Sequence, residues 1–111
     1  MNKAELDKTV TTALKCVREI NKRMTPPLMN DLYFGSIEHD PQQLIVCYIF
    51  ADEQARAEAE AAGHCARITQ QTVEALREAG YPAEVLDSIR IAFEGEKEII
   101  DHGGYYAYFY K

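Results

Sequence analysis

Residues 44–50 have the sequence LIVCYIF, an uninterrupted apolar run. A short run of this kind, rich in β-branched and aromatic side chains, is typical of a strand covered on both faces. The preceding residues 32–38 (LYFGSIE) alternate less regularly and contain Gly35, which favours an edge or bulged strand. Between the two runs, residues 39–43 (HDPQQ) are rich in turn formers. The stretch therefore predicts a β-hairpin whose second strand is central in a sheet.

Upstream of the hairpin the pattern is that of an amphipathic helix. Apolar residues recur at steps of three and four from Leu6 to Met24, while lysines and arginines occupy the other side. Asn2 followed by Glu5 is a loose match to a capping box at the start of a helix. Residues 25–27 (TPP) mark its end, because proline cannot continue helical hydrogen bonding.

Downstream of the hairpin, residues 52–79 return to a helical pattern. Asp52 fits the N-cap position, and Gly80 followed by Pro82 ends the helix. Within this helix Gly63 costs about 1 kcal/mol relative to alanine. We therefore expect one long helix that is either continuous or bent or broken at Gly63.

The remaining residues predict two more strands. Residues 88–94 (SIRIAFE) alternate between apolar and polar side chains, as in a half-buried strand. Residues 95–104 (GEKEIIDHGG) contain two adjacent glycines and are expected to form a connector, which leaves residues 105–111 (YYAYFYK) as a closing strand. If Phe109 faces the helices, the other face of that strand carries three tyrosines. These are Tyr106, Tyr108 and Tyr110.

The expected order is helix, strand, strand, helix, strand, strand. This order favours an α+β fold with a mostly antiparallel four-stranded sheet and both helices packed on one face, so that the other face stays partly open. The chain has 111 residues, of which 47% are apolar and 27% charged, and it contains no long Pro/Gly/Ser-rich linker. A single globular domain over residues 1–111 is the corresponding prediction.

The charge is distributed unevenly along the chain. The formal net charge is −6, and residues 1–24 hold six basic and three acidic groups, or +3, so the remainder carries −9. An acidic surface repels phosphate, which argues against a nucleic acid and is compatible with a basic protein partner. No apolar run approaches the ~18 residues that span a bilayer, and the start MNKAELDK is too charged for a signal peptide. We therefore expect a cytoplasmic protein without a membrane segment.

Candidates for catalysis and metal binding are weak in this sequence. Cys16, Cys47 and Cys65 are far apart and each falls in an element that is expected to be buried, which indicates reduced core thiols. His64 adjoins Cys65, but neighbours on a helix point ~100° apart and do not face each other. The histidines and cysteines show none of the short spacings of zinc sites. We expect a non-catalytic protein with no metal site and no cofactor.

Acidic residues precede the C-terminal tyrosines. The carboxylates of this segment are Glu94, Glu96, Glu98 and Asp101. Tyrosine supplies large, stiff contact area and is enriched at protein interfaces, so an aromatic patch bordered by these acids would suit a cationic protein surface. The same tyrosines also fit a purely structural role, because aromatic pairs stabilise sheets. A second acidic candidate lies at the start of the long helix and comprises Asp52, Glu53, Glu58 and Glu60.

The C-terminal third, residues 75–111, has the sequence ALREAGYPAEVLDSIRIAFEGEKEIIDHGGYYAYFYK. Its succession of helix, GYP corner, strand, acidic connector, GG and aromatic end resembles small bacterial immunity proteins of polymorphic-toxin and contact-dependent growth-inhibition systems. The resemblance implies a cytoplasmic protein that binds and blocks one cognate toxin domain, often a basic nuclease. The partner-binding residues expected from the sequence are Glu94, Glu96, Glu98, Asp101, Tyr106, Tyr108 and Tyr110.

Two other classes of function remain open on the sequence alone. An open sheet face could instead form a homodimer or a small-ligand pocket, which would make the chain a self-associating or small-ligand-binding α+β domain. An enzyme is the third class, and it would require a pocket that holds an acid or a histidine with a strongly shifted pKa.

Overall fold

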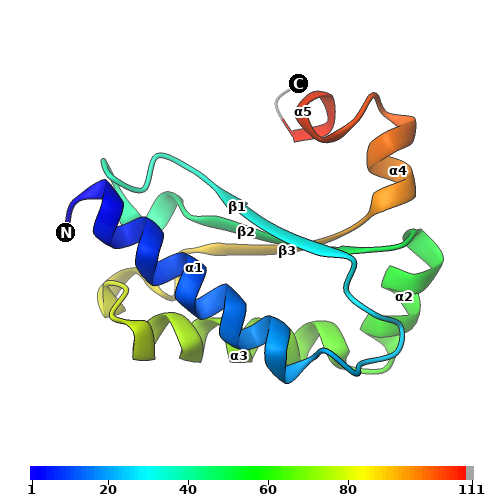
Figure 1. Cartoon of the computed structure of the whole chain (residues 1–111), viewed down its shortest axis with the longest axis horizontal. Coiled ribbons are helices and arrows are strands. Elements are labelled where there is room, and N and C mark those ends of the chain that lie inside the picture. The colour runs from blue at the N-terminus through cyan, green and yellow to red at the C-terminus, as the bar shows by residue number, and fades with distance from the viewer. Residues whose placement is uncertain (110–111) are drawn as a thin grey trace.

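The computed structural model of the protein describes residues 1–109. The helices and strands of this range are, in chain order, α1 (Lys3–Ile20), β1 (Asn30–Phe34), β2 (Ile45–Phe50), α2 (Glu53–Ala61), α3 (His64–Ala79), β3 (Arg90–Gly95), α4 (Glu96–Asp101) and α5 (Tyr105–Phe109), with short 3₁₀ turns at Pro41–Gln43 and Ala83–Val85. The fold is α+β, and one sheet separates two unequal helical layers (Figure 1).

The three strands form one mixed sheet in the order β1-β2-β3. β1 and β2 are antiparallel, with Leu32 opposite Cys47, whereas β2 and β3 are parallel, with Cys47 opposite Ala92. β2 is thus the central strand, as its apolar sequence predicts, and every residue from Val46 to Phe50 is buried.

One face of the sheet is covered by α1 and α3, which lie side by side (Figure 1). We call it the helix face. Its core consists of apolar side chains from both helices and from the strand residues that point toward them. They include Leu6, Val10, Leu14, Val17, Val46, Tyr48, Ile68 and Leu76.

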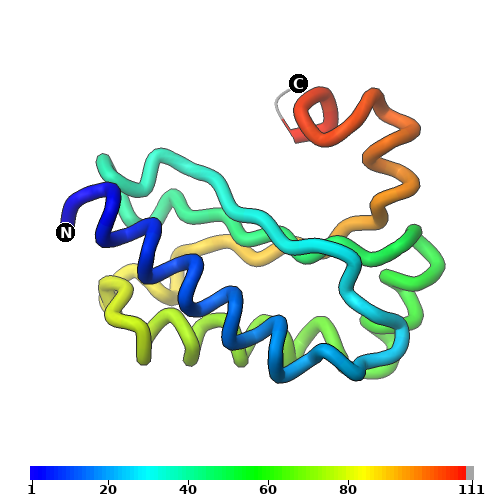
Figure 2. Tube along the Cα trace, viewed as in Figure 1, coloured from blue at the N-terminus to red at the C-terminus, as the bar shows by residue number. Residues whose placement is uncertain are grey.

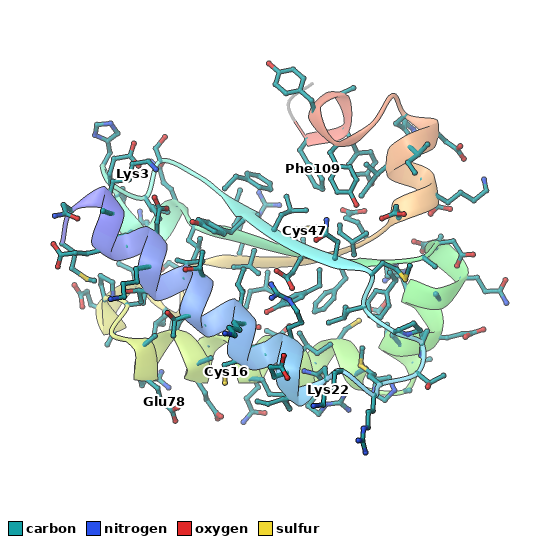
Figure 3. All side chains as sticks on the ribbon, viewed as in Figure 1. Lys3, Cys16, Lys22, Cys47, Glu78 and Phe109 are labelled. Carbon is teal, nitrogen blue, oxygen red and sulfur yellow. The ribbon has the colours of Figure 1, made fainter. Side chains whose placement is uncertain are left out.

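The opposite face carries the last part of the chain, α4 and α5, which lie above the sheet in Figure 1. We call residues 96–109 the C-terminal layer. A smaller apolar cluster holds this layer to the sheet. It comprises the buried residues Cys47, Ile49 and Ile99 and the half-buried residues Leu32, Ala92, Tyr105, Tyr108 and Phe109. Figure 3 shows Phe109 on the side of α5 that faces the strands.

Several predicted helix boundaries are confirmed. Asn2 caps α1 in a complete capping box, since its side chain accepts a hydrogen bond from the Glu5 N–H at 2.9 Å. Asp52 caps α2 by accepting from the Ala55 N–H at 2.8 Å. The long helix is broken at Gly63, which has a φ of 82° and separates α2 from α3.

The predicted four-stranded, mostly antiparallel sheet with two helices is wrong. The described residues form three strands and five α-helices, and β3 is parallel to β2. Figure 2 shows why: after β2 the chain passes through α2 and α3 beneath the sheet and returns to the end of the sheet at which β2 begins. β3 starts from that same end. A strand that follows such a helical crossover runs in the same direction as the strand before it.

The predicted closing strand over residues 105–111 is also wrong where the structure describes it, because residues 105–109 form α5. Tyr105, Tyr108 and Phe109 face the sheet, and their i, i+3, i+4 spacing is that of a helix. The expected connector is helical as well, and α4 buries Ile99. Aromatic content favours a strand, but the burial of Tyr105, Tyr108 and Phe109 follows helical periodicity.

The passage from β3 into the C-terminal layer depends on Gly95. A Cβ atom at this position would lie 2.6 Å from the Asp52 carbonyl carbon and 2.7 Å from the Glu53 nitrogen. The end of β3 therefore approaches the start of α2 more closely than any residue with a side chain could.

Candidate functional site

The structure brings most of the predicted partner-binding residues together around the C-terminal layer. Glu94 lies near the end of β3 on the sheet face beneath α5, whereas Glu96, Glu98 and Asp101 lie on α4. Tyr106 and Tyr108 lie on α5. Tyr110 is outside the described residues.

The acids and rings of this region pair with one another. The Tyr108 hydroxyl donates to Glu94 Oε2 at 2.7 Å, and the Tyr105 hydroxyl donates to Glu96 Oε2 at 3.1 Å. These two hydrogen bonds tie α5 to β3 and to α4. Part of the expected binding site is therefore used to hold the C-terminal layer on the sheet.

The phenol–carboxylate pairs change the acidity of the tyrosines. The hydrogen bond to Glu94, together with burial, raises the pKa of Tyr108 to about 12, because ionisation would place a second negative charge beside the carboxylate. Burial is the main cause that raises the pKa of Tyr105, and Glu96 adds to it. Both phenols are neutral donors near neutral pH.

The remaining acids of α4 differ in their surroundings. Asp101 forms an exposed i, i+4 ion pair with Lys97 at 2.8 Å. Glu98 is half-buried, and its Oε1 atom accepts no hydrogen bond from residues 1–109. Residues 94–101 contain four acids and one lysine, so this segment carries −4 + 1 = −3. The region is anionic even though several of its carboxylates have intramolecular partners.

The outer side of the C-terminal layer exposes large side chains. Tyr106 is 79% exposed and Ile100 is 59% exposed. The predicted stripe of tyrosines on one face is wrong for the described residues, because residues two apart on a helix point in nearly opposite directions. Tyr106 faces outward whereas Tyr108 faces the sheet. The surface accessible to a partner therefore consists of an outward tyrosine and isoleucine beside several acids.

A groove opens between α5 and the sheet where the C-terminal layer stops covering the strands. Its volume is about 390 Å³, and it is lined by Phe34, Ile45, Cys47, Arg90, Ala92, Glu94, Tyr108 and Phe109. The Phe34 and Phe109 rings lie 5.4 Å apart across it. Burial and the nearby Glu94 raise the pKa of Cys47 to about 12, so only a small fraction of this thiol is ionised, and therefore reactive, at neutral pH.

A larger hollow of about 490 Å³ lies on the other side of the sheet, between α1 and β1. Arg18 and Asp31 form a two-pronged ion pair across it, with distances of 2.9 and 2.8 Å. The Tyr33 hydroxyl, also in its wall, donates to Asp7. Nothing in the sequence pattern pairs Arg18 with Asp31, so this hollow was not predicted.

The second acidic candidate, at the start of α2, is largely engaged within the helix. Arg56 contacts Glu53 at 2.6 Å and Glu60 at 2.7 Å. The hydrogen bond from Arg56 lowers the pKa of Glu53. Asp52 serves as the N-cap. These contacts favour a structural role for this acidic cluster.

Residues 1–109 contain no group of three or more histidine, cysteine, aspartate or glutamate side chains placed to hold a metal ion.

Cys47 and Cys65 are buried, as predicted, but Cys16 is exposed, so the prediction that it is a core thiol is wrong. His64 Nδ1 lies 2.9 Å from Arg67 Nη1, which places the imidazole in a surface contact on α3.

No known family model matches the chain, and neither a curated protein nor a solved structure is similar enough to count as a match. Among the described residues, no helix combines the length and the apolar character needed to cross a bilayer.

Proposed function

We propose that the chain is a non-catalytic binding protein that acts in the bacterial cytoplasm as an immunity protein and neutralises one cognate toxin domain. The proposed contact surface is the outer side of the C-terminal layer. The partner would present a basic surface, as the catalytic domain of a nuclease does. This proposal rests on one observation: the exposed Tyr106 and Ile100 stand beside a segment with a charge of −3.

Each kind of side chain has a distinct part in the proposed contact. Tyrosine is a frequent anchor at interfaces because its ring buries much area while its hydroxyl keeps a hydrogen bond. The carboxylates would attract a basic partner before contact and so raise the association rate, an effect that falls with added salt. The apolar cluster under α5 and the Tyr108–Glu94 bond hold this surface in place.

The direct test is binding to the toxin domain encoded immediately upstream in the genome, measured by calorimetry with purified proteins. We expect tight, stoichiometric binding and loss of toxin activity. Truncating an anchor tyrosine commonly costs 2 kcal/mol or more, so Tyr106→Ala should weaken binding by about thirtyfold. Ile20→Ala is the control, since Ile20 is another large exposed side chain, 59% exposed, and lies outside the C-terminal layer at the end of α1.

The electrostatic part of the proposal needs its own measurement. The association rate with the toxin domain should fall as salt rises, and Asp101→Asn should reduce it, whereas Asp87→Asn, an exposed acid outside the C-terminal layer, should not. Absence of any complex with the toxin domain, or an equal effect of Tyr106→Ala and Ile20→Ala, would contradict the proposed function.

A second candidate function is supported by the groove under α5. With a volume of about 390 Å³, it falls within the ~300–1,000 Å³ that small-molecule sites occupy. Its lining is mostly apolar, with Arg90 and Glu94 as polar groups. Ala92→Phe would fill it. If the chain is a small-ligand-binding domain, Ala92→Phe should abolish binding of a ligand found by screening. If it is an immunity protein, Ala92→Phe should leave binding of the toxin domain unchanged.

A further inference from the structure

The outer edge of β1 is open. β1 pairs with β2 on one side only, and among residues 1–109 no element pairs with its other side. The Asp31 N–H donates to the Asn30 side-chain oxygen at 2.9 Å, which places it among the backbone groups that point away from β2. Backbone groups alternate between the two sides of a strand, so Tyr33 also points outward. Such an edge is a template for a further strand.

The hollow of about 490 Å³ lies directly beside this edge. Its strand wall is formed by Asp31, Leu32 and Tyr33, and its helix wall by Thr11, Lys15 and Arg18. An open strand edge next to a helix is a known arrangement for strand addition, in which the guest's backbone bonds to the strand and its side chains meet the helix.

The charge of the hollow is set by Lys15. Arg18 is neutralised by Asp31, whose side chain is only 7% exposed and receives both guanidinium hydrogen bonds. Lys15 is exposed and makes no ion pair within the described residues. A guest strand would therefore meet a positive charge on the helix side.

The two sides of the edge differ in polarity. A guest strand beside β1 would point alternate side chains toward α1, where Lys15 and Thr11 lie, and toward the opposite sheet face, where Leu32 and Phe34 lie. An acidic side chain suits the first direction and an apolar one the second. The complementary guest is thus an extended segment with alternating acidic and apolar residues.

A second copy of this chain fits poorly. A two-fold pair through β1 would place the same surface of each copy opposite itself and bring the two α1 helices together. α1 holds four basic and three acidic groups, a charge of +1 in each copy, so two such helices gain no electrostatic attraction from their net charge when they are brought together. The charge favours an acidic strand from a different protein.

We infer that the outer edge of β1, together with α1, binds an extended acidic segment of a partner protein, which joins the sheet as a fourth strand. This docking surface is separate from the C-terminal layer, which lies on the other face of the sheet (Figure 1). The inference does not depend on the proposed immunity function.

The test uses a capped heptapeptide of alternating valine and glutamate, titrated into isotope-labelled protein and followed by NMR. The largest amide shifts are expected at Asp31 and Tyr33, and the amide hydrogens on the outer edge of β1 should exchange more slowly. A peptide with the same side chains but N-methylated at every residue has no backbone N–H donor on either edge, so it cannot complete the backbone bonds and should not bind.

Two variants test the charge of the helix wall. Exposed ion pairs contribute up to about 1 kcal/mol, so Lys15→Glu should weaken binding of the valine–glutamate peptide by about threefold to fivefold. Arg77→Glu makes the same charge change at an exposed position on α3 and should leave binding unchanged.

Three results of the peptide titrations would overturn the inference, and a fourth comes from the protein alone. They are amide shifts away from β1, equal binding of the N-methylated peptide, and equal affinity of the Lys15→Glu and Arg77→Glu variants. Concentration-dependent shifts at β1 without peptide would point to a second copy as the occupant and would overturn it as well. None of these results bears on Tyr106 and the toxin domain, so failure here is distinguishable from failure of the proposed function.

Discussion

The two faces of the sheet are covered in different ways. On the helix face, α1 and α3 bury one continuous apolar cluster, and its few polar groups are satisfied inside it: the Tyr48 hydroxyl and Thr72 Oγ1 lie 2.6 Å apart. On the opposite face, two short helices cover part of the strands, and phenol–carboxylate hydrogen bonds supplement a small cluster. The helix face therefore contributes most of the stability of the fold. The C-terminal layer exposes surface to a partner, and substitutions in it should destabilise the protein less.

The largest expected difference between the faces is in the cost of removing one buried aliphatic side chain. Ile68 and Ile99 are both fully buried, the first within the large cluster and the second within the small one. Ile68→Ala should lower the free energy of unfolding by about 4 kcal/mol and Ile99→Ala by about 2, because a thin layer collapses more readily into a cavity. Urea denaturation measures both, and equal costs would break the comparison.

The next effect concerns the point where the chain leaves the sheet for the C-terminal layer. Gly95→Ala introduces a Cβ within 2.7 Å of the α2 backbone, so β3 and α2 must separate. Overpacking of this kind typically lowers the free energy of unfolding by about 1–3 kcal/mol. Gly104→Ala, where a Cβ meets nothing within 4 Å, is a control that changes backbone strain without a clash. A milder loss in Gly95→Ala than in Gly104→Ala, measured by thermal unfolding, would contradict the close approach.

Phe109→Ala tests the cover over the groove. The half-buried ring packs against Phe34 and Tyr108, and its loss should cost about 1.5 kcal/mol. It should also let thiol reagents reach Cys47 more often. In a Cys16→Ser background, Cys47 is expected to react at least tenfold faster in Phe109→Ala than in Tyr106→Ala, the control on the outer side of α5. Equal rates would show that α5 does not cover Cys47.

Single hydroxyl groups sharpen the comparison further. Tyr48→Phe removes a buried hydrogen bond on the helix face and should cost about 1 kcal/mol, while Thr72 keeps its bond to the Ile68 carbonyl. Urea denaturation at neutral pH measures both losses in the free energy of unfolding. A smaller loss for Tyr48→Phe than for Tyr108→Phe would contradict the view that the helix face contributes more stability.

The smallest effect is the pH dependence of the Tyr108–Glu94 bond. The folded pKa of Tyr108 is about 12, above its ordinary value of 10.0, so the bond stabilises the protein below pH 10 and is lost as pH rises through 12. Tyr108→Phe should cost less than about 1 kcal/mol at neutral pH, and its difference from the wild type should shrink over this alkaline range. A difference that grows with pH would contradict the assignment.

The helix face could be predicted from the sequence because its signals are local and agree with one another. The apolar residues from Leu6 to Val17 repeat with helical spacing, Asn2 and Asp52 cap helices, and residues 44–50 form an apolar strand. The parallel direction of β3 depends on how α2 and α3 cross beneath the sheet, which no local pattern specifies.

The candidate site could be predicted only in part. The acids and tyrosines are neighbours in the sequence, which predicts that they form one region. The aromatic content of residues 105–111 favours a strand, whereas the rings that pack on the sheet, Tyr105, Tyr108 and Phe109, have helical spacing. The pairing of Tyr108 with Glu94 spans 14 residues of sequence and requires the fold to be known. The same is true of the Arg18–Asp31 pair beside the open edge of β1.

The central claim is that residues 105–109 pack as a helix on the second face of the sheet instead of extending it. The most direct measurement is the set of nuclear Overhauser contacts of these residues in solution. The structure predicts contacts between the Phe109 and Phe34 rings, whose centroids lie 5.4 Å apart, and amide–amide contacts between successive residues of α5. Cross-strand contacts between the backbone of residues 105–109 and that of β3 would contradict it.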